Sequence, residues 1–141
     1  MTAKSYLQQI KRCDINIDNG VEELTRLNAL ATRVTSAVSG DVVSRTRNTD
    51  TLGDTVAKII KLQEDINREV DRYVDIKREA MRLLSQLENP VYYQILHSRY
   101  ILYKTWEQIA CDMDFTYQWV CELHGRALQE FAKIMEESLQ S

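Results

Sequence analysis

Acidic side chains recur between residues 64 and 75, and they are the first residues of this chain whose types could do chemistry. On a helix such carboxylates can hold Mg²⁺. The stretch contains Glu64, Asp65, Arg68, Asp71, Arg72 and Asp75. Because arginines alternate with the acids and no second acidic helix pairs with them, we interpret the stretch as a solvated, charge-mixed helix face.

The cysteines and histidines do not form a recognisable reactive site. Cys13, Cys111 and Cys121 are odd in number and have neither CxxC nor zinc-finger spacing, which predicts buried, reduced thiols. His97 and His124 lack a second ligand at metal spacing. We therefore expect no enzymatic activity and no cofactor.

Residues 105–131 carry the pattern of a short helix, a tight turn and a longer helix. Thr105 with Gln108 three positions later is a capping box, which marks a helix start. The segment 112–115 predicts the turn, and Thr116 is a natural N-cap for the second helix. Its core-facing stripe is Val120, Leu123, Ala127, Leu128 and Phe131. This order is typical of a helix-turn-helix, whose second helix enters the DNA major groove.

The stripe leaves an outward side on the second helix, and this side would face the groove. Its members are Tyr117, Gln118, Cys121, Glu122 and, further on, Gly125 and Arg126. Trp119 stands among them, and the sequence leaves open whether it contacts a protein partner or packs on another helix.

The same residues resemble region 4 of bacterial sigma factors. The matching positions, in order and spacing, are Trp106, Ile109, Ala110, Met113, Thr116, Val120, Leu123, Ala127 and Leu128. The whole chain is similar to a family of small phage and prophage proteins that join a long N-terminal helical hairpin to a sigma-like C-terminus ending in LHGRAL, here residues 123–128. Some members of that family are ArpU-type late-gene transcriptional regulators.

The resemblance implies roles for individual residues. It places base-facing side chains at Tyr117, Gln118 and Cys121, with Glu122 nearby. A glutamine can bond adenine with both ends of its amide, and a tyrosine can contact a phosphate or a thymine methyl. Arg126 and Lys104 are the implied phosphate contacts. The chain departs from the sigma pattern where aromatic residues and Cys121 replace basic ones on this face.

Two long helical patterns precede this segment. The first seam is Leu7, Ile10, Ile17, Val21, Leu24, Ala31 and Val38. The second is Leu52, Val56, Ile59, Ile66, Val70, Tyr73, Ala80, Leu84 and Leu87, with Gln63 and Lys77 as polar members and Pro90 ending the helix. Gly20 marks a point where the first helix could kink or break.

A polar, Gly-containing segment at about 39–51 predicts a loop at the tip of an antiparallel hairpin. If residues whose numbers sum to about 91 face each other, Asp14 meets Lys77 and Asn28 meets Gln63. A stagger of half a heptad would separate these pairs.

With only 4 Gly and 1 Pro, the chain should be nearly all helix. We predict an all-α protein with an antiparallel helical hairpin (a coiled coil) over residues 1–89, followed by a three-helix, sigma-region-4-like helix-turn-helix domain over residues 90–141. No apolar run approaches the roughly 20 residues of a membrane span, and the first residues lack a signal core. We therefore expect a cytoplasmic protein without a membrane partner.

Charge bears directly on the expected partner. Residues 91–141 hold four Lys/Arg against seven Asp/Glu, which disfavours tight DNA binding by a single copy. The leading interpretation is a phage-type transcription regulator that binds promoter DNA, RNA polymerase or both, as a homo-oligomer with a dimer favoured. The alternative is a protein-interaction adaptor whose helix-turn-helix no longer binds DNA.

Overall fold

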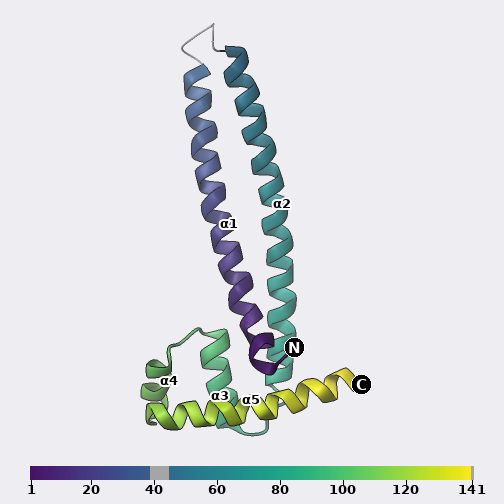
Figure 1. The fold of residues 1–141 in the computed structure, drawn as a ribbon, viewed down its shortest axis with the longest axis vertical. Helices are drawn as coiled ribbons and strands as arrows, with labels where there is room; N and C mark the ends of the chain where they lie inside the picture. The colour runs from purple at the N-terminus through teal and green to yellow at the C-terminus, as the bar shows by residue number, and fades with distance from the viewer. Residues whose placement is uncertain (39–44, 141) are drawn as a thin grey trace. The chain divides into compact units, whose positions relative to one another are not determined.

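The computed structural model describes the backbone of residues 1–38 and 45–140 and the side chains of 1–36 and 51–140. In this part of the chain all regular structure is helical, without strands, and short turns join the helices (Figure 1). The elements are α1 (Ala3–Val38), α2 (Arg45–Leu84), α3 (Pro90–Leu96), the π-helix η1 (His97–Ile101), α4 (Trp106–Met113) and α5 (Tyr117–Gln140). The predicted all-α class is confirmed, and so is the long helical hairpin formed by the first two helices. No helix in the described ranges is long and apolar enough to cross a membrane.

The chain divides into two compact units. The hairpin unit is Asp14–Arg72, and the core unit joins Met1–Cys13 to Tyr73–Ser141. The ends of both long helices therefore belong to the same unit as α3, α4 and α5. The sequence patterns, by contrast, place a division at residue 90.

Within the hairpin unit, α1 and α2 run antiparallel and pack through half-buried side chains. α1 is helical through Gly20, so the break considered there is absent. A Cβ atom added at Gly20 would lie 2.9 Å from Cγ1 of Ile66, which shows how closely the second helix approaches at this point. The residue numbers of this facing pair, Gly20 and Ile66, sum to 86, whereas the predicted register requires a sum of about 91. The predicted register is therefore wrong. Asn28 and Gln63, the expected buried pair, are both exposed.

The inner seam of the hairpin unit agrees with the predicted one at most positions, since Ile17, Leu24 and Ala31 on α1 and Leu52, Ile59 and Ile66 on α2 are half-buried. It differs at three valines. Val21, Val56 and Val70 are exposed rather than inward-facing. The half-buried positions include Gly20, Leu27 and Val34 on α1 and Leu62 and Glu69 on α2. The exposed valines and these added positions have the same heptad spacing, so periodicity alone could not choose between them as the second half of the seam.

The ends of α2 are likewise displaced from their predicted places. The helix begins at Arg45, which makes residues 45–51 helical, and the rest of the predicted tip loop lies outside the described residues. It stops at Leu84, six residues before Pro90. Pro90 is instead the first residue of α3, a position whose backbone N–H would have no partner within the helix, so its absence in proline costs nothing. Asn89 caps this helix: its Oδ1 accepts the backbone N–H groups of Val91 and Tyr92 at 2.9 and 3.4 Å.

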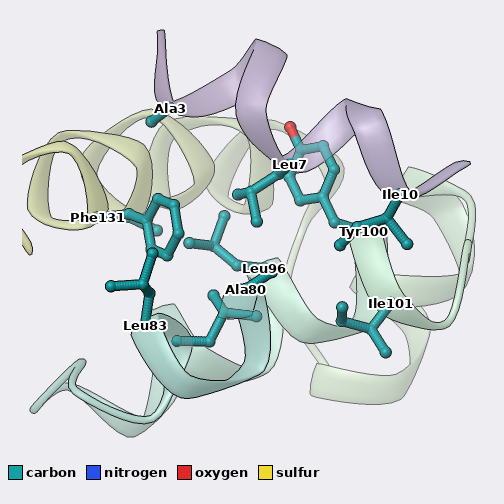
Figure 2. Close-up of a cluster of buried hydrophobic side chains, with 11 residues drawn as sticks. Ala3, Leu7, Ile10, Ala80, Leu83, Leu96, Tyr100, Ile101 and Phe131 are labelled. Atoms are coloured by element: carbon teal, nitrogen blue, oxygen red, sulfur yellow. The ribbon is translucent and has the colours of Figure 1, made fainter. Parts of the chain in front are cut away.

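The core unit is organised around a cluster of buried side chains from every long segment it contains (Figure 2). Figure 2 shows Leu7, Leu96 and Phe131 converging from three different helices. All three side chains are completely buried. The cluster comprises Ala3, Leu7, Ile10, Ala80, Leu83, Leu84, Leu96, Tyr100, Ile101, Ala127 and Phe131. The first turns of α1 are therefore part of the scaffold that holds α5.

Candidate nucleic-acid interface

A second buried cluster, also in the core unit, positions α4 against α5. Its buried members are Ile95, Ile109, Ala110, Val120 and Leu123. The predicted capping box at the start of α4 is confirmed: Oγ1 of Thr105 accepts the backbone N–H of Gln108 at 3.2 Å, and Oε1 of Gln108 accepts that of Thr105 at 2.9 Å. These contacts fix both the start and the buried side of α4.

The turn between α4 and α5 lies at residues 114–116, two residues later than predicted, because Asp112 and Met113 still belong to α4. Asp114 has φ 59° and ψ 40°, a left-handed conformation that aspartate tolerates better than most residues. Oγ1 of Thr116 then accepts the N–H of Trp119 at 3.1 Å, which confirms Thr116 as the N-cap of α5.

The predicted reading face is exposed on the first turns of α5. Tyr117, Gln118, Cys121 and Glu122 all lie at the surface, while Val120 and Leu123 of the same turns are buried. The Cys121 side chain, one helical turn from Tyr117, raises the pKa of the tyrosine through its charge and a hydrogen bond. The hydroxyl of Tyr117 is therefore a neutral hydrogen-bonding group at neutral pH, free of the charge that would repel phosphate.

Both implied phosphate contacts already have acidic partners. Nη2 of Arg126 lies 2.8 Å from Oε1 of Glu122, and Nζ of Lys104 lies 2.7 Å from Oδ2 of Asp112. Arg126 also covers the ring of Trp119, with its guanidinium carbon 5.4 Å from the ring centroid. Trp119 remains 38% exposed. Each ion pair would have to rearrange before its cation could bind a phosphate directly.

Two further cations were not singled out from the sequence. Lys11 and Arg99 line a cavity of about 150 Å³ together with Gln8, Tyr100 and Tyr103, and none of these five residues is acidic. Nη1 of Arg99 donates to the carbonyl oxygen of Lys104 at 3.0 Å, and its guanidinium lies over the Trp106 ring at 4.4 Å. The cavity cation Arg99 is thus held against Trp106, the first residue of α4.

The backbone beside this cavity departs from a regular helix. In η1 the N–H of Leu102 donates to the carbonyl of His97 at 3.1 Å, an i→i+5 bond of the π type. Tyr103 follows with φ 58°. Single π-helical turns occur frequently at functional sites. Nothing in the sequence of residues 91–101 indicated this π-helical turn.

His124 is part of the scaffold of α5 rather than of the reading face. Its Nε2 shares a hydrogen bond of 2.8 Å with the Tyr100 hydroxyl, and its ring meets Trp106 edge-on with centroids 4.5 Å apart. Burial first, and then the charges of Lys4 and Arg99, lower its pKa to about 4. The ring is therefore neutral at physiological pH, and Trp106 packs beside it against the second buried cluster.

The remaining reactive residue types do not form a site in the described part of the chain. Cys13 is buried as predicted, but Cys111 and Cys121 are exposed thiols, so the expectation that all three are buried is wrong. Where the spacing of cysteines is uninformative, the sequence does not distinguish a cysteine that packs in the core from one that lies at the surface. Among the described residues, no group of three or more His, Cys, Asp or Glu side chains could hold a metal ion.

The core unit has a different charge balance from that of residues 91–141 alone. Counting Met1–Cys13 and Tyr73–Ser141 together, ten Lys/Arg stand against ten Asp/Glu. The difference comes from cations such as Lys4, Lys11 and Arg12 on the first turns of α1. The objection that this region is too acidic for DNA is therefore weaker for the folded unit.

No family model, no curated protein sequence and no solved structure matches the chain.

Proposed function

We propose that the chain is a cytoplasmic, phage-type transcription regulator that binds promoter DNA through α4, the turn at 114–116 and α5. The observation that supports it best is the exposure of Tyr117, Gln118 and Cys121 on the first two turns of a helix whose other side is buried. A major groove about 12 Å wide admits such a helix. The resemblance to sigma region 4 and to ArpU-like proteins agrees with this proposal.

Lys11 and Arg99 supply phosphate contacts that the exposed face of α5 lacks. Among the described residues, neither has an acidic partner within ion-pair distance, unlike Lys104 and Arg126, and Arg99 lies over Trp106 at the start of α4. A cation that need not give up an ion pair contributes more of its Coulomb energy to phosphate binding. We therefore assign base contacts to Gln118 and Tyr117 and backbone contacts to Arg99 and Lys11.

Fluorescence anisotropy with labelled DNA duplexes tests this assignment. We would use duplexes about 20 base pairs long, roughly two helical turns, both as a random-sequence pool and as prophage promoter sequences. Arg99→Ala should weaken binding to all duplexes alike and reduce the slope of log K against log salt by about 1. Gln118→Ala should weaken binding mainly to the preferred sequence, by about 1–3 kcal/mol. Lys133→Ala is the matched control, because Lys133 is ion-paired to Glu130 far along α5.

A second function, that of a protein adaptor, is favoured by the apolar side chains exposed on the core unit. Leu102, Tyr117 and Trp119 are exposed, and the two implied phosphate contacts, Lys104 and Arg126, are ion-paired. Purified RNA polymerase, captured by the protein in the presence of nuclease, would support the adaptor. If wild type shows no salt-sensitive binding to any duplex, the DNA proposal is lost.

A further inference from the structure

The cavity between α1 and η1 in the core unit is lined by cations and by no acidic side chain. Its lining residues are Gln8 and Lys11 on α1, Arg99 and Tyr100 of η1, and Tyr103 just after η1. Tyr100 is buried, Arg99 and Tyr103 are half-buried, and Gln8 and Lys11 are exposed. Figure 2 shows the ring of Tyr100 extending toward the first turns of α1. The cavity therefore reaches from the surface of α1 inward to a buried phenol.

The guanidinium of Arg99 is held in place by protein groups alone. Its Nη1 donates to the carbonyl oxygen of Lys104 at 3.0 Å, and it lies 4.4 Å from the centre of the Trp106 ring. The chain turns back to make this contact, since the N–H of Lys104 donates to the carbonyl of Ser98 at 3.0 Å and Tyr103 has φ 58°. A left-handed tyrosine is strained, and such strain occurs at ligand-binding sites. A cation fixed in this way loses little freedom when it binds an anion.

Lys11 reaches the same cavity from α1. Its Nζ lies 5.8 Å from the centre of the Tyr103 ring, at cation–π distance. Gln8 and Lys11 are three residues apart and so share one face of the helix. In the described part of the chain, neither Lys11 nor Arg99 lies within ion-pair distance of an acidic side chain. Two like charges in one cavity repel each other, and a bound anion offsets that repulsion.

The other groups of the cavity add no negative charge. Burial, opposed by the charge of Arg99, raises the pKa of Tyr100 to about 12, so its phenol is neutral at physiological pH. The Tyr100 hydroxyl already shares a hydrogen bond of 2.8 Å with Nε2 of His124. A guanidinium and an ammonium carry donors and no acceptor, and the amide of Gln8 supplies further donors. The cavity is therefore suited to a negatively charged group rich in acceptor oxygens.

Size and charge select a phosphoryl group on a single attachment. The cavity has a volume of about 150 Å³, that of about five water molecules at about 30 Å³ each. This space holds a phosphoryl group with its oxygens but no sugar or base beside it. A phosphomonoester carries a charge of about −1.5 to −2 at pH 7, which matches two cations better than the single charge of a phosphodiester does. A monoester can also enter a recess end-on, whereas a diester is flanked on both sides.

We propose that this cavity binds the phosphoryl group of a small phosphomonoester. Arg99 and Lys11 neutralise its charge, Gln8 donates to its oxygens, and the rest of the ligand lies in solvent at the surface of α1. Arg99 and Lys11 are also the backbone contacts of the DNA complex proposed above. The ligand therefore competes with DNA for both cations and acts as an effector that releases it. This consequence rests on the proposed function, whereas binding in the cavity does not.

An NMR titration of the full chain tests binding in the cavity. The indole N–H resonance of Trp106 reports on the cavity because Arg99 lies over this ring. At constant ionic strength, inorganic phosphate should shift the resonance to saturation with a Kd on the order of 1 mM, since so small a ligand makes few contacts. Glycerol 2-phosphate, a monoester, should bind similarly. Dimethyl phosphate, a diester with one charge less, should bind about tenfold more weakly.

Variants of the two cations test the assignment of residues. Lys11→Gln and Arg99→Gln should each weaken phosphate binding by about tenfold, because each removes a charged hydrogen-bond donor. Arg12→Gln is the matched control, since Arg12 is an exposed cation next to Lys11 that does not line the cavity. Far-UV circular dichroism checks the fold, and the exposed Lys11 keeps the test valid if Arg99→Gln loosens its segment. A wild type that does not saturate, a Lys11→Gln variant that binds like wild type, or equal binding of dimethyl phosphate overturns the proposal.

Competition separates the effector from the DNA proposal. In the anisotropy assay at constant ionic strength, glycerol 2-phosphate should release a labelled duplex from wild type at concentrations near its own Kd, and dimethyl phosphate should not. A protein that saturates with phosphate but binds no duplex keeps the cavity and loses the DNA proposal. A protein that binds duplexes but does not saturate with phosphate loses the cavity alone. Binding of both without competition overturns the effector role.

Discussion

Apolar residues repeat every three or four positions in both compact units, yet they are buried in only one of them. In the core unit, Leu7, Leu96 and Phe131 are completely removed from water by helices that come from opposite ends of the chain. In the hairpin unit, side chains of the same types at the same spacing stay half-exposed, because each helix meets one neighbour instead of several. Periodicity therefore tells which side of a helix is inward, and the number of neighbours tells how much stability that side contributes.

The largest contrast should appear on truncating one apolar side chain in each unit. Phe131→Ala removes a fully buried ring and should lower the free energy of unfolding by about 3–5 kcal/mol. Leu27→Ala removes a half-buried side chain of the hairpin and should cost about 1 kcal/mol. Guanidinium unfolding followed by circular dichroism measures both. Equal losses would show that the hairpin unit has a core as well buried as that of the core unit.

A pH effect of intermediate size should be confined to the core unit. The pKa of His124 is lowered from 6.5 to about 4 in the folded chain, so below pH 6.5 the unfolded chain binds a proton that the folded chain does not. The contribution of neutral His124 to the free energy of unfolding is therefore complete above pH 6.5 and is lost as the pH falls toward 4. His124→Gln should unfold with a shallower dependence on pH than wild type over this interval. Parallel pH profiles for the two proteins would contradict the assignment.

The smallest contrast concerns one glycine from each unit, both within long helices. A Cβ at Gly125 meets nothing within 4 Å, so Gly125→Ala should stabilise the chain by up to about 1 kcal/mol through helix propensity. At Gly20 the added Cβ would lie 2.9 Å from Cγ1 of Ile66, and this crowding should cancel most of the same gain. Thermal unfolding of the two variants compares them. A full gain at Gly20 would show that α1 and α2 separate easily.

Local signals predicted where the helices of the candidate interface begin. The capping box at Thr105 and the N-cap at Thr116 formed as expected, because each depends on residues at most three positions apart. The π-turn at His97–Ile101 and the left-handed Tyr103 were not predicted. They depend on how a short segment fits between distant helices, which no local pattern records.

The position of Arg99 and Lys11 in one cavity could not be predicted from the sequence for the same reason. The two residues are far apart in the chain and meet because the first turns of α1 pack into the core unit. The hairpin register was mispredicted on different grounds. Heptad spacing is the same at every register, so only a contact between the two helices, such as the close approach of Ile66 at Gly20, fixes which residues lie opposite each other.

The sequence by itself determined that the chain is helical, where α4 and α5 begin, and which side of α5 is buried. These properties follow from backbone capping and from a hydrophobic period that spans a few residues. Only the tertiary structure decided the register of the hairpin, which cations lack an acidic partner among the described residues, and which side of the hairpin is left exposed. Those properties depend on contacts between residues far apart in the chain. The free energies of packing and desolvation decide among the alternatives, and they arise only where helices meet.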